Sequence, residues 1–130
     1  MLQVLPIQSK LKQEELCLRC GVTYNPDLLA YAATVDGQAA GICQFKLTEK
    51  SGLVYDIAPT PELNSFEALF VMGRGTLNFI DLCGVHRAFF DAVYENETLI
   101  KAIGFSKNAN GRYEVDLTDF FKEPCKHSNH

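Results

Sequence analysis

Residues 53–105 decide the fold and read LVYDIAPTPELNSFEALFVMGRGTLNFIDLCGVHRAFFDAVYENETLIKAIGF. The apolar stretch Leu53–Ala58 at the start is expected to form a strand. Apolar residues at three- and four-residue spacing then predict a long helix over Ser65–Cys83. A second strand is predicted over Val85–Val93, followed by a short helix that ends at Gly104. Because a tight turn cannot join parallel neighbours, two strands connected through a helix are expected to lie parallel.

The residues before this stretch predict a helix and a hairpin. The helix is expected between Ser9, a residue type that caps helix N-termini, and Gly21, a residue type that ends helices. The hairpin joins Leu29–Val35 to Gln38–Leu47. Its turn is Asp36-Gly37, a pair that tolerates the positive φ angles of a tight turn. The next strand would then follow in antiparallel order.

Further strands are predicted at the two ends, over Met1–Ile7 and Arg112–Leu117. The 130 residues, 47% of them hydrophobic, are enough for one compact domain with a real core. We expect a single domain over residues 1–122 and a flexible C-terminal tail over residues 123–130. The fold class is α/β (α+β), with a mixed, mostly antiparallel central sheet flanked by helices.

The composition limits the classes of function. A net charge of −4 argues against a general nucleic-acid binder, which needs a basic face to pair with phosphates. No apolar run approaches the roughly 20 residues that span a bilayer. Met1–Ile7 is too short, and lacks the basic start, for a secretory signal, so a cytoplasmic location is expected. The five cysteines are an odd number, and three lie in apolar patterns, which favours reduced, mostly buried thiols.

The order of these elements resembles the GNAT acetyltransferase superfamily. The similarity covers about Leu29–Leu117. The motifs that carry it are the hairpin Tyr31–Leu47 with its glycine at Gly41, then Gly84-Val85 before a strand, Asn96 after that strand, and the closing Gly104-Phe105. The resemblance implies a GNAT-like acyl-CoA N-acyltransferase fold and transfer of an acetyl group from acetyl-CoA to an amine. The acceptor amine is not identified by the sequence.

The resemblance also implies a place for acetyl-CoA. In that family the cofactor lies where the fourth and fifth strands separate, with its pyrophosphate at the N-terminus of the following helix, where free amides and the helix dipole favour anions. Backbone amides of Ile57 and Ala58 would polarise the thioester carbonyl. The other positions implied to bind the cofactor are Asn64, Ser65, Phe66, Glu67 and Asn96.

Asp56 is the candidate general base. Strand alternation puts Tyr55 and Asp56 on opposite faces of the sheet. A carboxylate in an apolar strand beside a cleft would have its pKa raised by desolvation, toward the range useful for taking a proton from an amine. The alternative interpretation of Asp56 is a hydrogen-bonded structural carboxylate, and structural carboxylates outnumber catalytic ones.

Two departures from the family pattern support a rival function. Phe66 and Glu67 replace the glycines and the basic residue of the phosphate loop, and Glu67 would repel a pyrophosphate. Ile100 occupies the position of the family's frequent general acid, a tyrosine, and Tyr94 and Tyr113 are the nearest tyrosines in sequence. The rival is a catalytically inactive GNAT-fold module for ligand sensing or protein interaction.

Other motifs on the long helix receive a structural interpretation. Gly73-Arg74-Gly75 does not directly follow a strand, so a dinucleotide-binding fingerprint is disfavoured, and Gly73 is expected to allow close packing. The polar positions Glu67, Arg74, Asn78 and Asp81 are expected to form a solvated face. If Val71, Met72 and Phe79 are exposed, they would form an apolar patch and support a homodimer.

Cysteine and histidine residues could in principle supply a zinc site. The possible ligands are Cys17, Cys20, Cys125, His127 and His130. Their irregular spacing, with one pair on a helix and the rest on a tail, is unlike structural zinc sites, so no metal is predicted. Cys43 and Cys83 are expected to be small core residues, and His86 a surface histidine.

Overall fold

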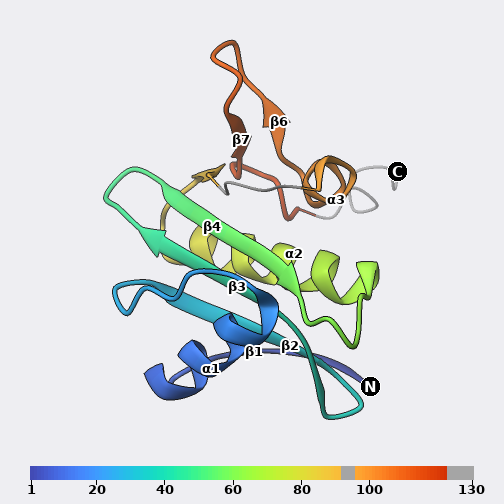
Figure 1. Ribbon diagram of the computed structural model, residues 1–130. Helices are drawn as coiled ribbons and strands as arrows, with labels where there is room; N and C mark the ends of the chain where they lie inside the picture. Colours follow the sequence, from blue (N-terminus) through green and yellow to red (C-terminus); the bar gives the residue numbers. More distant parts are fainter. Residues whose placement is uncertain (92–95, 123–130) are drawn as a thin grey trace.

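The computed structural model describes residues 1–91 and 96–122 and contains one seven-stranded sheet with helices on both faces (Figure 1). The strands follow the order β1-β2-β3-β4-β5-β7-β6. The elements, in chain order, are β1 Leu2–Pro6, α1 Lys10–Cys20, β2 Leu29–Val35, β3 Gln38–Leu47, β4 Gly52–Pro59, α2 Phe66–Leu82, β5 Arg87–Phe90, α3 Glu97–Ile103, β6 Ser106–Lys107 and β7 Tyr113–Asp116.

The sheet is mixed and mostly antiparallel, as the sequence predicts. β1 to β4 pair in antiparallel order, and so do β5, β7 and β6. Among the strands of the described residues, only β4 and β5, which are joined through α2, are parallel. The two-residue strand β6 was not expected, because a strand that short has no detectable alternation. The predicted second strand continues to Val93, but residues 92–95 lie outside the described residues.

The two long helices cover opposite faces of the sheet. One apolar cluster lies between the sheet and α2 and includes Phe45, Val54 and Leu77. A smaller cluster lies between the sheet and α1 and includes Leu16 and Ile42. Figure 1 shows α2 passing behind the strands, with α1 beside β1 and β2. The chain therefore forms three layers, with α3 packed beside α2.

The predicted turn and caps are confirmed. Asp36 and Gly37 have φ angles of 51° and 82°, the positive values that the hairpin turn requires. Ser9 Oγ accepts a hydrogen bond from the amide of Lys12 at the start of α1. Ser65 Oγ accepts from the amide of Ala68 at the start of α2. These caps satisfy amides that have no partner inside the helix.

The exposure that an apolar patch on α2 would require is not found. Met72 is fully buried, and Phe79 packs edge-on against the rings of Tyr31 and Phe45. Only Val71 of the three residues is exposed. The helix is buried over a wider arc than the predicted stripe because it contacts the sheet on one side and α3 on another. The proposed homodimer patch therefore does not form, and a homodimer stays a prediction.

On the face of α2 that was expected to be solvated, Glu67 and Asn78 are exposed, but Arg74 is partly buried against α3. Arg74 Nε donates to the backbone carbonyl of Ile103 over 2.5 Å. Its guanidinium also lies over the rings of Phe70 and Phe120, at 5.0 and 5.1 Å. Arg74 thus satisfies a carbonyl at the C-terminal end of α3, where a positive charge is favoured by the helix dipole. Phe66, the first residue of α2, is 47% exposed.

Gly73 has the packing role that was expected, and its neighbour is Ile103 of α3. A Cβ at Gly73 would overlap the side chain of Ile103. The missing side chain therefore allows α2 and α3 to approach closely.

The thiols are buried to different degrees. Cys17 and Cys43 are buried and Cys20 is partly so, but Cys83 is exposed, which contradicts its expected place in the core. Within residues 1–91 and 96–122, no three metal-ligating side chains come close enough to hold an ion. Cys125, His127 and His130 lie outside the described residues. No helix in the described part of the chain has the length and apolar character to cross a membrane.

Candidate functional site

A cleft opens where β4 and β5 separate. The two strands pair only over Gly52–Val54 and Ala88–Phe90. The last hydrogen bond between them runs from the amide of Asp91 to the carbonyl of Val54 over 2.8 Å. β4 continues to Pro59 and pairs there with β3 alone. A cavity of about 680 Å³ lies against this part of β4.

The cavity is lined by several segments of the chain. The connection between α1 and β2 contributes residues of the range 20–28, and β4 contributes Tyr55–Pro59. The remaining lining residues come from β3, from the β4–α2 connection and α2 itself, from the end of β5 and from the start of α3: Lys46, Asn64, Leu69, Phe90, Asp91, Asn96, Leu99 and Ile100. Of the residues that could have filled such a cleft, Phe90 lines the cavity without closing it, and Phe66 and Phe89 do not line it. The cleft is therefore open.

A β-bulge on β4 sets the direction of Asp56. Gln44 pairs with Asp56, whereas the next residue of β3, Phe45, pairs with Val54. Tyr55 is thus an extra residue without a partner on β3. In a regular strand Val54 and Asp56 would share a face. Because of the bulge, Val54 packs in the cluster under α2 while Asp56 is bonded to Gln44 on the α1 side.

Asp56 lies in the cavity and also has a buried hydrogen-bond partner. Gln44 Nε2 donates to Asp56 Oδ2 over 2.6 Å. Burial raises the pKa of Asp56, and the hydrogen bond from Gln44 opposes that rise without cancelling it. The upward shift is the direction expected from the sequence. Asp56 is therefore hydrogen-bonded and also accessible from the cleft, which is compatible with either interpretation, and its role as a base stays a prediction.

The thiols near Asp56 are poor nucleophiles. Burial raises the pKa of Cys17 to about 11 and that of Cys43 to about 12, and the charge on Asp56 adds a smaller rise to each. Burial likewise raises the pKa of Cys20, which lines the cavity, to about 12. A thiol with such a pKa stays protonated at neutral pH, and the thiolate is the reactive form. A cysteine nucleophile is therefore disfavoured here.

The predicted cofactor positions divide into two groups. Ile57, Ala58, Asn64 and Asn96 line the cavity. Ser65, Phe66 and Glu67 do not line it. Ser65 caps α2, and Glu67 lies in the first turn of that helix. Their proposed role in binding a cofactor stays a prediction.

The residues that were considered for the position of a general acid do not all lie at the cavity. Ile100 is buried and lines the cavity. Tyr113 is buried elsewhere and donates to Glu97 Oε2 over 2.5 Å. Tyr94 lies outside the described residues. Among the described tyrosines, Tyr55 lines the cavity, and the sequence analysis placed it on β4 without considering it as a general acid.

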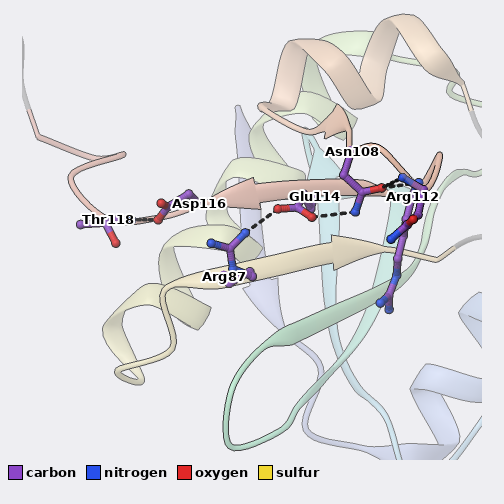
Figure 2. Close-up of polar contacts among 7 residues, drawn as sticks. Arg87, Asn108, Arg112, Glu114, Asp116 and Thr118 are labelled. Atoms are coloured by element: carbon purple, nitrogen blue, oxygen red, sulfur yellow. Dashed lines mark hydrogen bonds and ion pairs between the residues drawn. The ribbon is translucent and has the colours of Figure 1, made fainter.

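Polar contacts between β5 and β7 fix the far wall of the cleft. Arg112 binds Asp91 through two hydrogen bonds of 2.9 and 2.7 Å, and its guanidinium lies 3.9 Å from the centre of the Phe89 ring. Figure 2 shows Glu114 between Arg87 and Asn108, which donate to it over 2.5 and 2.7 Å. These contacts tie β5 to β7, on the side away from β4. The exposed His86 pairs instead with Asp81, outside the cleft.

Comparison with solved structures identifies the fold. No protein-family model matches the chain, and no curated protein sequence gives a significant match. The IAA acetyltransferase from Bacillus cereus superposes with a TM-score of 0.72 at 16% identity, covering 90% of this chain and 100% of that one. This protein has the GNAT acetyltransferase fold.

Two further structures show how far the GNAT fold extends over the chain. A Bacillus subtilis acetyltransferase in complex with CoA gives a TM-score of 0.71 at 14% identity, covering 91% of this chain and 100% of that one. A Desulfovibrio desulfuricans acetyltransferase of the GNAT family gives 0.68 at 15% identity, with 91% and 100% covered. At these identities the likeness shows the fold alone. This chain is therefore a divergent member of the fold.

Proposed function

We propose that this chain is an N-acetyltransferase that moves an acetyl group from acetyl-CoA to an amine. The observation that carries the proposal is the open cavity of about 680 Å³ at the β4–β5 separation, with Asp56 in its wall. That volume lies in the range of small-molecule sites. Further support comes from a GNAT-fold neighbour that was solved in complex with CoA.

Residues on β4 and α2 fit the cofactor. Among the described residues, no strand pairs with β4 past Val54 on its β5 side, so the backbone of Ile57–Pro59 would bond an extended ligand along that edge. The first amides of α2 have no partner within the helix and favour an anion, and only that of Ala68 is capped by Ser65. Asn64 and Asn96 would contact the cofactor from the cavity wall. Bound there, acetyl-CoA would supply the acetyl group as an activated thioester.

Asp56 would act on the acceptor. An amine enters mainly as an ammonium ion and must lose a proton before its nitrogen can attack. Asp56 Oδ1 has no hydrogen-bond partner among the described residues, so it is available to accept that proton. The raised pKa of Asp56 makes it a stronger base than an ordinary aspartate. Positioning of acetyl-CoA and the amine in one cavity would contribute the rest of the rate enhancement.

Isothermal titration calorimetry with acetyl-CoA and with CoA tests the proposal. We expect micromolar binding, about −8 kcal/mol, and no comparable heat with ATP, which carries phosphates but no pantetheine arm. Absence of heat with either coenzyme up to millimolar concentration would overturn the transferase assignment.

The second candidate function is a GNAT-fold module that binds a ligand without turnover. It is favoured by Ile100 in the tyrosine position and by Phe66 and Glu67 at the start of α2. The two functions separate in an assay of CoA thiol release from acetyl-CoA with a panel of amines. Release that depends on the amine supports the transferase, whereas tight coenzyme binding without release supports the module.

A further inference from the structure

A chain of buried side-chain amides leads from the surface of α1 to Asp56. Lys10 Nζ donates to Gln13 Oε1 over 3.1 Å, and Gln13 Nε2 donates to Gln44 Oε1 over 3.0 Å. Gln44 Nε2 then donates to Asp56 Oδ2 over 2.6 Å. Gln13 and Gln44 are both 0% exposed. This series of hydrogen bonds connects three elements, because Lys10 and Gln13 belong to α1, Gln44 to β3 and Asp56 to β4.

The direction of every amide in this chain is fixed by groups that can only accept or only donate. Lys10 can only donate, so the oxygen of Gln13 must face it. The backbone carbonyls of Leu28 and Thr23 can only accept. The carbonyl of Leu28 receives Gln13 Nε2 over 3.3 Å, and the carbonyl of Thr23 receives Gln44 Nε2 over 2.8 Å. Both side chains are therefore oriented from two sides, and the amide nitrogen of Gln44 must point at Asp56.

We propose that Gln44 is the positioning residue of Asp56, and that Gln13, Lys10 and the carbonyls of Thr23 and Leu28 hold Gln44 in the donating direction. Gln44 binds Oδ2 and thereby leaves Oδ1 directed to the acceptor. The inference rests on the proposed function only in giving Asp56 its role as base. The orientation of Asp56 by Gln44 is a property of the free protein.

The same series of hydrogen bonds does not conduct the proton that Asp56 would take from the amine. A primary amide neither gains nor loses a proton near neutral pH, so Gln13 and Gln44 cannot pass one from Asp56 to Lys10. A proton taken up by Asp56 therefore returns to solvent through the cavity. Gln44 acts by orientation and by stabilising the charged carboxylate, because a donated hydrogen bond favours the ionised form.

Other charged and titratable groups near Asp56 do not replace Gln44. The thiols of Cys17 and Cys20 on α1 and of Cys43 on β3 are neutral, since burial raises the pKa of each to about 11 or 12. Asp91, across the cavity, is bound by Arg112. The remaining ionisable groups of the cavity wall are Asp27, Lys46 and Tyr55. Gln44 is the side chain in hydrogen-bond contact with the Asp56 carboxylate among the described residues.

The test is a carbon-13 NMR titration of the Asp56 carboxyl in the free, full-length protein. Gln44→Met removes both donors at similar volume, and we expect it to raise the pKa of Asp56 by about one unit, a tenfold weaker acid. Gln38→Met on the exposed start of the same strand is the matched control and should leave that pKa unchanged. An unchanged pKa of Asp56 in a folded Gln44→Met protein would overturn the inference.

A second variant covers the case in which Gln44→Met does not fold. Gln13→Met keeps the contact between Gln44 and Asp56 but removes the donor that faces Gln44 Oε1. We expect a smaller rise in the pKa of Asp56, of the same sign. No shift in this variant would contradict the holding role of Gln13.

Kinetics provide the readout that separates this inference from the proposed function. If the chain turns over acetyl-CoA, the acidic limb of the kcat/KM profile should move upward with the pKa measured by NMR. Inactive wild-type protein with the NMR shift present would reject the transferase and leave the role of Gln44 intact. Active protein without the shift would reject the role of Gln44 alone.

Discussion

Gln44 and Asp56 are directly paired across β3 and β4, and their side chains are joined by a hydrogen bond of 2.6 Å. The bond ties a fully buried amide to a carboxylate in the wall of an open cavity. Gln44 thus connects the α1 layer to the site where β4 leaves β5. The consequences can be measured in activity and in stability.

Asp56→Asn should abolish most acetyl transfer while leaving coenzyme binding unchanged. A general base contributes about 10²- to 10⁴-fold, so kcat/KM should fall within that range. The fold should persist, because the oxygen of the introduced amide can still accept from Gln44. Asp27→Asn, at another carboxylate of the same cavity, is the control for simple loss of charge. Undiminished turnover in Asp56→Asn would show that Asp56 is structural.

The raised pKa of Asp56 predicts a pH dependence of stability. The folded protein holds the Asp56 proton more tightly than the unfolded chain, whose value is near 3.8. The contribution is fully present below that value and is lost as the pH rises through the higher folded pKa. Urea unfolding from pH 3 upward should therefore show wild type losing stability relative to Asp56→Asn. If the free energies of unfolding of the two proteins change with pH in parallel, the raised pKa of Asp56 is contradicted.

Gly73→Ala should destabilise the contact between α2 and α3. The added Cβ would overlap Ile103, and overpacking of this kind costs about 1–3 kcal/mol in the free energy of unfolding. Gly75→Ala on the same helix is the matched control, since its Cβ would lie 3.6 Å from Val4 Cγ1, an ordinary contact. Gly75→Ala should be neutral or stabilising. Adding Ile103→Val should partly rescue Gly73→Ala in urea unfolding.

Glu67→Gln should strengthen coenzyme binding a few-fold if the start of α2 receives the pyrophosphate. Removing the carboxylate removes repulsion that is screened by salt, so the gain should shrink at high ionic strength. The helix itself should lose about 0.3–1 kcal/mol, because Glu67 lies in the first turn, where negative charge is favoured. Glu62→Gln, whose carboxylate pairs with Arg19, is the control. Equal affinities in calorimetry would place the pyrophosphate elsewhere.

The sequence predicts those parts of the fold that depend on local chemistry. Asp36-Gly37 fixes the hairpin, and the apolar period with Ser65 fixes α2, since turn and cap geometry involve only neighbouring residues. The place of the cleft followed from the resemblance to the GNAT fold. The burial of Met72 and the contact of Arg74 with α3 could not be predicted, because they depend on packing between segments that are distant in the chain.

The candidate site was predicted less fully than the fold. Asp56 was selected from its apolar surroundings, and burial does raise its pKa. Its partners Gln13 and Gln44 carry no motif, and 31 residues separate them from each other in sequence. The bulge at Tyr55 likewise has no sequence signal, because it arises from the register of β4 against β3. Each of these features is a relationship between distant segments.

The cleft lies where β4 is one residue too long for its partner. Removing Tyr55 would leave Val54 facing α2 and Asp56 facing α1, since those two residues already pair with consecutive residues of β3. What would disappear is the irregularity of β4 at the point where its pairing with the described part of β5 ends. The candidate cleft thus coincides with a change in the number of residues in β4 and not in the type of any one residue. When related chains are aligned, a gap at this position would mark a β4 strand that pairs with β3 without the bulge.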